Sequence, residues 1–147
     1  MADDCLLYRI ALSSVHAIKP SDAMQLVARL GSEAAFFEEK ESALIALAGR
    51  RLSAFGRGYR DKLLEAARRE LDFISRYNIN VRYYTDKEYP LRLSQCEDAP
   101  LMIYSLGDCD LNAGHVVSIV GTRHATAYGT DFVNALVADL ASSLEGL

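Results

Sequence analysis

The sequence predicts an α/β protein in which a small all-helical bundle is followed by the beginning of a parallel sheet. Residues 5–75 carry apolar side chains at helical spacing, separated by glycine and proline. After residues 78–80 (Asn-Ile-Asn) the pattern changes to short runs of β-branched and aromatic residues. A single strand–turn–helix pattern then occupies residues 116–144. We therefore expect two domains, a helical one over 1–76 and the first part of a sheet domain over 77–147.

Composition limits the classes of function. The chain has 147 residues, half of them hydrophobic, and a net charge of −4, so contact with nucleic acid would require a local basic patch. Residues 50–69 provide a candidate patch, with seven arginines and lysines against Asp61 and Glu65. The alternative interpretation is a solvated surface of helix and loop.

The three cysteines are odd in number and lack the spacing of metal ligands, which is typical of reduced thiols. The N-terminus is acidic and lacks the basic region of a signal peptide. No apolar run approaches the roughly 18 residues of a membrane span. We therefore expect a soluble, cytoplasmic protein that does not interact with membranes.

Four short helical segments are predicted within residues 5–47. Residues 5–12 form a short apolar helix, and a second helix begins after Pro20, capped by Ser21 or Asp22, and ends at Gly31. Ser32 caps a third short helix, and residues 42–47 form one or two further turns.

Residues 60–76 form the clearest helix, because their apolar side chains recur at helical spacing with charges between them. Together these helices predict a SAM-like or helix-hairpin-helix-like bundle. Bundles of that kind often bind DNA through a glycine-containing hairpin turn. The candidate turn at residues 15–19 has no glycine, so a structural or partner-docking role is favoured over DNA binding.

Beyond residue 80, two extended segments are expected at 81–85 and 100–106, with Tyr89-Pro90 fixing a turn or short helix between them. Tyr83, Tyr84 and Tyr89 cluster near the domain junction. Packing is the simpler interpretation of these rings, and stacking on nucleic-acid bases is the alternative.

Residues 116–120 (Val-Val-Ser-Ile-Val) resemble a strand buried on both faces, ended by Gly121. A helix is expected from Tyr128 to Leu144, with an apolar stripe that includes Val133 and Leu140. A strand, a glycine turn and a helix N-terminus together form an anion site of the Rossmann-like kind, and Arg123 adds a guanidinium suited to phosphate. A plain strand-to-helix turn with a solvated Arg123 is the alternative.

The sequence lacks four common motifs of cofactor binding and catalysis. The turn does not continue as a Gly-x-Gly-x-x-Gly dinucleotide fingerprint, because the next glycine is Gly129. Nothing resembles a Walker loop, a zinc site or a serine nucleophile elbow. We therefore expect no catalytic residues, no metal and no cofactor.

Several ordered segments resemble one known family. Residues 89–93 read Tyr-Pro-Leu-Arg-Leu, and residues 100–107 read Pro-Leu-Met-Ile-Tyr-Ser-Leu-Gly. Residues 119–123 read Ile-Val-Gly-Thr-Arg and are followed by Tyr128-Gly129. These segments are similar in order and spacing to the signatures of the DNA-processing protein A family (DprA, also called Smf) of natural transformation. The resemblance covers residues 77–147.

The resemblance implies a non-enzymatic protein that binds and protects incoming single-stranded DNA and helps to load the RecA recombinase. It also implies a homodimer of the complete protein, formed through regions that would follow Leu147. The residues that match the family's phosphate-binding motif, or line the same pocket, are Gly121, Thr122, Arg123, Thr126, Tyr128 and Gly129.

Two other functions are compatible with parts of the sequence. A related Rossmann-like enzyme that cleaves phosphoribosyl-nucleotides would use the same glycine turn for a nucleotide phosphate. It would need a glycine-rich phosphate loop with catalytic Arg and Glu, and that combination is not found in the 147 residues. A purely structural or docking domain would account for the helical bundle alone.

Overall fold

The protein forms two compact units in the computed structural model, which describes the backbone of residues 2–144 and the side chains of residues 5–143. The first unit extends to Ala113 and the second begins at Gly114. Residues 145–147, the end of the second predicted domain, lie outside the described part, as does the side chain of Leu144.

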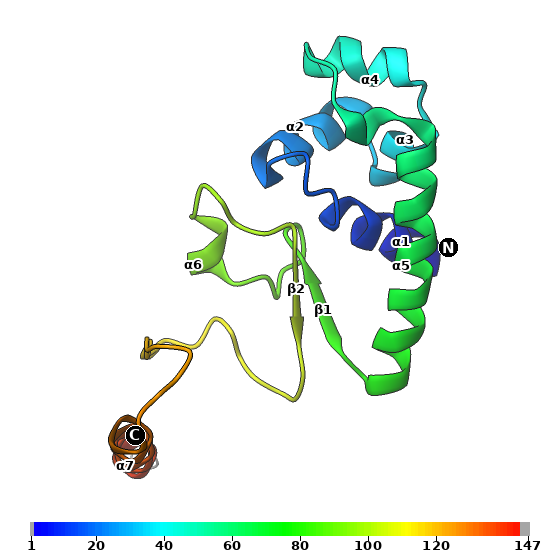
Figure 1. The fold of residues 1–147 in the computed structure, drawn as a ribbon. Coiled ribbons are helices and arrows are strands. Elements are labelled where there is room, and N and C mark those ends of the chain that lie inside the picture. Colours follow the sequence, from blue (N-terminus) through cyan, green and yellow to red (C-terminus); the bar gives the residue numbers. More distant parts are fainter. Residues whose placement is uncertain (1, 145–147) are drawn as a thin grey trace. The chain divides into compact units, whose positions relative to one another are not determined.

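The first unit is mainly helical, as predicted (Figure 1). Its longest helix, α5, lies beside α1, and α3 packs against both of them as well as against α2. The helices are α1 (Ala2–Ser13), α2 (Pro20–Leu30), α3 (Glu33–Glu38), α4 (Glu41–Ala48), the 3₁₀ turn η1 (Ser53–Phe55) and α5 (Arg57–Tyr77).

Local sequence signals set several helix ends. Gly31 ends α2 with a φ of 88°, a left-handed conformation that glycine adopts without steric cost. The Ser32 hydroxyl accepts a hydrogen bond from the N–H of Ala35 at 3.2 Å and caps α3 as expected. The cap expected at Ser21 or Asp22 is wrong, because α2 already begins at Pro20. Proline suits that position, since the first helical N–H has no intrahelical partner.

Two short strands follow α5. Strands β1 (Asn80–Tyr83) and β2 (Met102–Ser105) pair antiparallel, with Val81 opposite Tyr104 and Tyr83 opposite Met102. The short helix α6 (Leu91–Ser94) lies between them in the sequence, where Tyr89-Pro90 predicted a turn or helix.

The predicted start of a Rossmann-like parallel sheet is not confirmed. Within residues 2–144 the sheet has two strands, and they are antiparallel. Residues 116–120, expected as a buried strand, have no regular secondary structure, and Val120 is 93% exposed. The physical reason is that a strand buried on both faces needs paired neighbours and covering helices, which the described part of the second unit does not supply.

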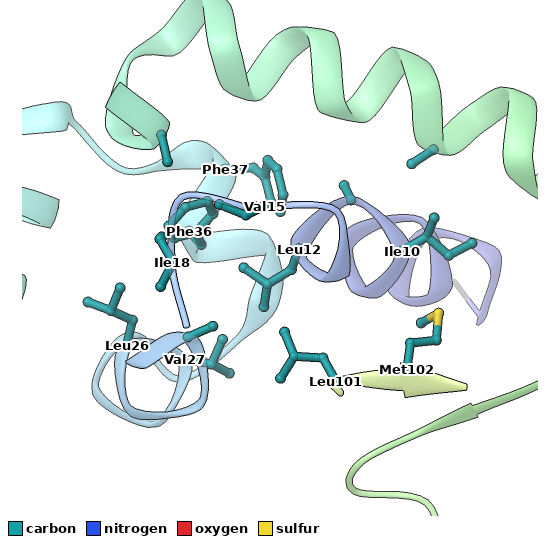
Figure 2. Packing of buried hydrophobic residues seen from close by; sticks show 14 of the residues in the cluster. Ile10, Leu12, Val15, Ile18, Leu26, Val27, Phe36, Phe37, Leu101 and Met102 are labelled. Atoms are coloured by element: carbon teal, nitrogen blue, oxygen red, sulfur yellow. The ribbon is translucent and has the colours of Figure 1, made fainter. Parts of the chain in front are cut away.

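One hydrophobic core joins the helices and the strands of the first unit (Figure 2). This cluster contains Ile10 and Leu12 of α1 and Phe36 and Phe37 of α3, and Phe36 packs edge-on to Phe37 with ring centroids 5.1 Å apart. Tyr83 of β1 and Met102 of β2 belong to the same core, together with Leu101, which directly precedes β2. The sheet is therefore held against the bundle by shared burial.

The second unit contains one helix, α7 (Ala127–Leu144), in its described part. This helix confirms the prediction for residues 128–144 and begins one residue earlier. Phe132 and Val137 are exposed, and the predicted stripe at Val133, Leu136 and Leu140 is only half-buried. In its described part, the second unit thus presents apolar side chains on its surface and contributes none to the hydrophobic core.

Candidate functional site

The predicted phosphate-binding residues all lie in the second unit, on the loop before α7 and in its first turn. Gly121, Thr122 and Arg123 are on the loop, and Thr126, Tyr128 and Gly129 surround the helix start. Gly129 is half-buried and the other five are exposed. The six residues are therefore close together along the chain and accessible to a ligand.

Thr126 caps the N-terminus of α7. Its Oγ1 accepts a hydrogen bond from the N–H of Gly129 at 3.2 Å, and its carbonyl accepts from the N–H of Thr130 at 3.0 Å. This geometry satisfies one of the N–H groups that a helix start leaves without an intrahelical partner. The hydroxyl of Thr126 accepts in this bond, so its own proton can still be donated to an anion.

The loop residues differ in the contacts that they make with the rest of the chain. The Thr122 hydroxyl donates to the carbonyl of His124 at 3.0 Å, which folds the loop back on itself. The Arg123 guanidinium makes no hydrogen bond or ion pair with any residue in the described part of the chain. A Cβ placed on Gly121 would meet no atom within 4 Å. The packing of the second unit therefore requires neither arginine at 123 nor glycine at 121.

The basic run at residues 50–69 is largely engaged in ion pairs. Arg50 pairs with Asp22 at 2.6 Å, and Arg51 pairs with Glu41 at 2.9 Å. Two further pairs lie within α5, Arg57–Asp61 at 3.0 Å and Arg69–Glu65 at 3.1 Å. Because these arginines already face carboxylates, the structure favours the interpretation of this run as a solvated surface.

Arg60 belongs to the same run but is only 1% exposed. Its Nη1 donates to the carbonyls of Phe36 at 2.7 Å and Glu39 at 2.8 Å, and so satisfies the C-terminal end of α3. Burial, followed by the nearby Arg57, lowers the pKa of Arg60. Sequence reasoning missed this role, although Arg60 lies in helical register with Ala67, Leu71 and Ile74 of the inward face.

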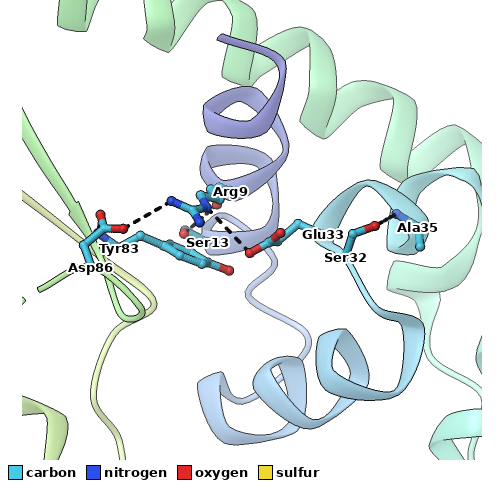
Figure 3. Close-up of polar contacts among 7 residues, drawn as sticks. All are labelled: Arg9, Ser13, Ser32, Glu33, Ala35, Tyr83 and Asp86. Atoms are coloured by element: carbon cyan, nitrogen blue, oxygen red, sulfur yellow. Dashed lines mark hydrogen bonds and ion pairs between the residues drawn. The ribbon is translucent and has the colours of Figure 1, made fainter. Parts of the chain in front are cut away.

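A second polar cluster that sequence reasoning missed joins α1, α3 and β1 (Figure 3). Arg9 of α1 lies 3.3 Å from Asp86 and 3.6 Å from Glu33, and its guanidinium stacks over the Tyr83 ring at 4.6 Å. The Tyr83 hydroxyl points toward Glu33 in Figure 3 but makes no hydrogen bond of ordinary geometry within the described residues. Burial and the Glu33 carboxylate raise the pKa of Tyr83.

The Tyr-Pro segment has a structural function in this fold. The Tyr89 hydroxyl donates to the carbonyl of Pro100 at 2.6 Å, so two of the segments that carry the resemblance are joined directly. The Asn112 side chain accepts from the N–H of Leu91 at 2.7 Å and holds the loop that follows β2. Because Tyr83 and Tyr89 are buried, packing is the correct interpretation of both rings.

No group of three or more His, Cys, Asp or Glu side chains among the described residues is arranged to hold a metal ion. Between Ala2 and Leu144, every helix is too short or too polar to cross a membrane.

Part of the chain is similar to known proteins. Residues 80–144 match the family described as DNA recombination-mediator protein A. The chain is also 36% identical to the DNA processing protein DprA of Bacillus subtilis, across 47% of this chain and 27% of that protein. The chain thus spans about a quarter of the length of this relative. No solved structure matches it. The matched region contains β1, β2, the Tyr-Pro segment and the turn before α7.

Proposed function

We propose that the chain acts in DNA recombination by binding single-stranded DNA through its phosphates, without catalysis. The main support is the match of residues 80–144 to a recombination-mediator family, which includes the accessible turn before α7. The proposal assigns binding to the second of the two predicted domains, residues 77–147.

The chemistry of the turn is suited to a phosphate. Arg123 carries a permanent positive charge and has no competing carboxylate among the described residues. Apart from that of Gly129, the first N–H groups of α7 have no intrahelical partner to donate to, and the helix start carries the positive end of the helix dipole. The Thr126 hydroxyl, once its oxygen has accepted from Gly129, can donate its proton to a phosphate oxygen. All of these contacts address the DNA backbone, so the proposed binding does not depend on sequence.

The remaining parts of the proposal concern the complete protein in the cell. There it protects incoming DNA during natural transformation and helps to load the RecA recombinase onto it. It acts in the cytoplasm, and the complete protein forms a homodimer. These roles follow from the resemblance, and each of them requires that the protein binds single-stranded DNA.

Fluorescence anisotropy of a labelled oligo-dT of about 20 nucleotides, measured at several salt concentrations, tests the proposal. Arg123→Ala should weaken binding and reduce the slope of log K against log salt by about 0.7, the value for one phosphate contact on a single strand. Arg51→Ala is a matched control, because it removes an exposed arginine that already faces Glu41. Duplex DNA should bind more weakly than oligo-dT.

If oligo-dT does not bind at any salt concentration, the proposal is wrong for this chain. If binding occurs but Arg123→Ala and Arg51→Ala behave alike, Arg123 is not part of the site. Release of a base from a nucleoside monophosphate would instead support the enzyme alternative.

A further inference from the structure

An apolar groove lies where the C-terminal end of α5 meets the β1–β2 sheet. Its volume is about 480 Å³. It is lined by Phe73 and Tyr77 from α5, by Ile79, and by Tyr104, Ser105 and Leu106 from the end of β2. All of these residues belong to the first unit and none belongs to the turn before α7.

The aromatic side chains of the groove are not used by the core. The inward face of α5 runs through Ala67 and Ile74, whereas Phe73 is 54% exposed and Tyr77 is similarly accessible. Phe73 and Tyr77 are four residues apart, and their ring centroids lie 4.4 Å apart at an angle of 43°. Tyr104 is also exposed, although burial of its hydroxyl and the neighbouring Glu70 carboxylate raise its pKa. Three accessible rings therefore line one groove, which is unusual for a surface without a binding function.

The charge around the groove has the opposite sign to that of the whole chain. Residues 68–82 contain four arginines (Arg68, Arg69, Arg76 and Arg82), of which Arg69 is paired with Glu65, against Glu70 and Asp72, whereas the chain carries a net charge of −4. Arg76 lies in the last turn of α5, between Phe73 and Tyr77 in sequence, and it makes no ion pair within the described residues. Arg82 donates to the hydroxyl of Ser105, one of the lining residues.

We propose that this groove stacks the bases of single-stranded DNA, as a second contact site separate from the phosphate-binding turn. The inference rests on the proposed function and extends it to the bases. An apolar partner would be expected to dock on a groove with neutral surroundings. Aromatic rings beside an excess of arginine favour a ligand that is both aromatic and anionic, and single-stranded DNA has both properties.

Different residues of the groove would contact the bases and the phosphates of the DNA. Phe73, Tyr77 and Tyr104 supply the stacking surface, and Arg76 supplies a charge for the neighbouring phosphate. Stacking does not distinguish one base from another, because every base has a π-face, so binding at the groove tolerates any sequence. It does require the bases to be present, which separates it from a site that contacts phosphates alone.

The first experiment uses a spectroscopic reporter in the 147-residue chain. The chain contains no tryptophan, so Phe73→Trp introduces a single one into the groove. Oligo-dT should quench its fluorescence, whereas an abasic oligomer of equal length should not. Leu91→Trp is the matched control, because Leu91 is 64% exposed on α6, outside both the groove and the phosphate-binding turn, and its fluorescence should not respond to either oligomer.

The second experiment measures affinity. The double variant Phe73→Ala, Tyr77→Ala should weaken oligo-dT binding by roughly tenfold or more, as expected for losing one to two stacked bases. Its affinity for the abasic oligomer should be unchanged. Circular dichroism establishes whether the double variant is folded. If it is not, the quenching of Phe73→Trp by oligo-dT still tests the inference.

Three results would overturn the inference. In the first, oligo-dT binds but does not quench Phe73→Trp, which would leave the proposed function standing. In the second, the double variant binds oligo-dT normally but changes the sedimentation of the chain, so that the groove is a contact between two copies. In the third, no oligomer binds to any form, and the proposed function fails together with the inference.

Discussion

The two compact units use the same residue types in opposite ways. In the first unit, Phe36 is fully buried and packs edge-on to Phe37 and Phe55. In the second, Phe132 is 57% exposed and the valine run at residues 116–120 lies on the surface. The difference arises because burial needs a complementary surface. Helices and strands supply one around Phe36, whereas the second unit has a single described helix. Its residues are therefore accessible to a ligand, while those of the first unit stabilise the fold.

The largest expected difference between the units concerns removal of a phenyl ring. Phe36→Ala should lower the free energy of unfolding by about 3–5 kcal/mol, because it removes buried apolar contacts and leaves a cavity. Phe132→Ala should change it by less than about 0.5 kcal/mol, since that ring is largely solvated. Urea unfolding followed by circular dichroism measures both. Equal losses would mean that Phe132 belongs to a core and that the comparison is wrong.

The next prediction compares the loss of stability when each of two arginines of α5 is replaced. Arg60→Met should cost about 2–4 kcal/mol, because it leaves the buried carbonyl of Phe36 and the part-buried carbonyl of Glu39 without this donor. Arg69→Met should cost less than about 1 kcal/mol, since its pair with Glu65 is exposed. Urea midpoints of the two variants give the comparison. Similar midpoints would show that Arg60 is solvated in solution.

A smaller effect depends on pH. The pKa of Tyr83 is raised above its usual value of 10.0 in the folded state, so the folded protein keeps this proton when the unfolded chain has lost it. The free energy of unfolding should therefore be unaffected below about pH 10 and fall above it, by at most about 1.4 kcal/mol per pH unit. Tyr83→Phe should reduce this fall.

The matched control for that measurement is Tyr128→Phe, which removes an exposed phenol from the second unit. Urea unfolding between about pH 9 and pH 11 should give the wild-type slope for this variant. If the two variants have the same slope, burial of Tyr83 does not govern the alkaline stability of the first unit.

The smallest effect compares two helix caps of the same kind. Ser32→Ala and Thr126→Ala each remove a hydroxyl that accepts from a helix N–H, which is worth about 1 kcal/mol. Ser32→Ala should lower the global free energy of unfolding by that amount, because α3 packs in the core. Thr126→Ala should leave global unfolding unchanged and increase hydrogen exchange in the first turn of α7. A global loss from Thr126→Ala would show that the second unit unfolds together with the first.

Sequence reasoning succeeded where the information is local. The stop at Gly31 and the cap at Ser32 depend on the conformation of one or two residues, and both are confirmed. The cap expected at Ser21 or Asp22 was wrong because the adjacent Pro20 can start the helix by itself. The Tyr-Pro segment was recognised as a turn, but its hydrogen bond to Pro100 joins residues eleven positions apart and left no local signal.

The sequence by itself determined the helical character of the first half, the helix at the C-terminal end and the family resemblance of residues 77–147, because periodicity and motif order are properties of the chain. Only the tertiary structure decided that β1 and β2 pair antiparallel, that Arg60 is buried and that residues 116–120 are not a strand. Strand pairing and burial depend on which distant segments meet. A run such as Val-Val-Ser-Ile-Val becomes a buried strand only when other strands and helices cover it.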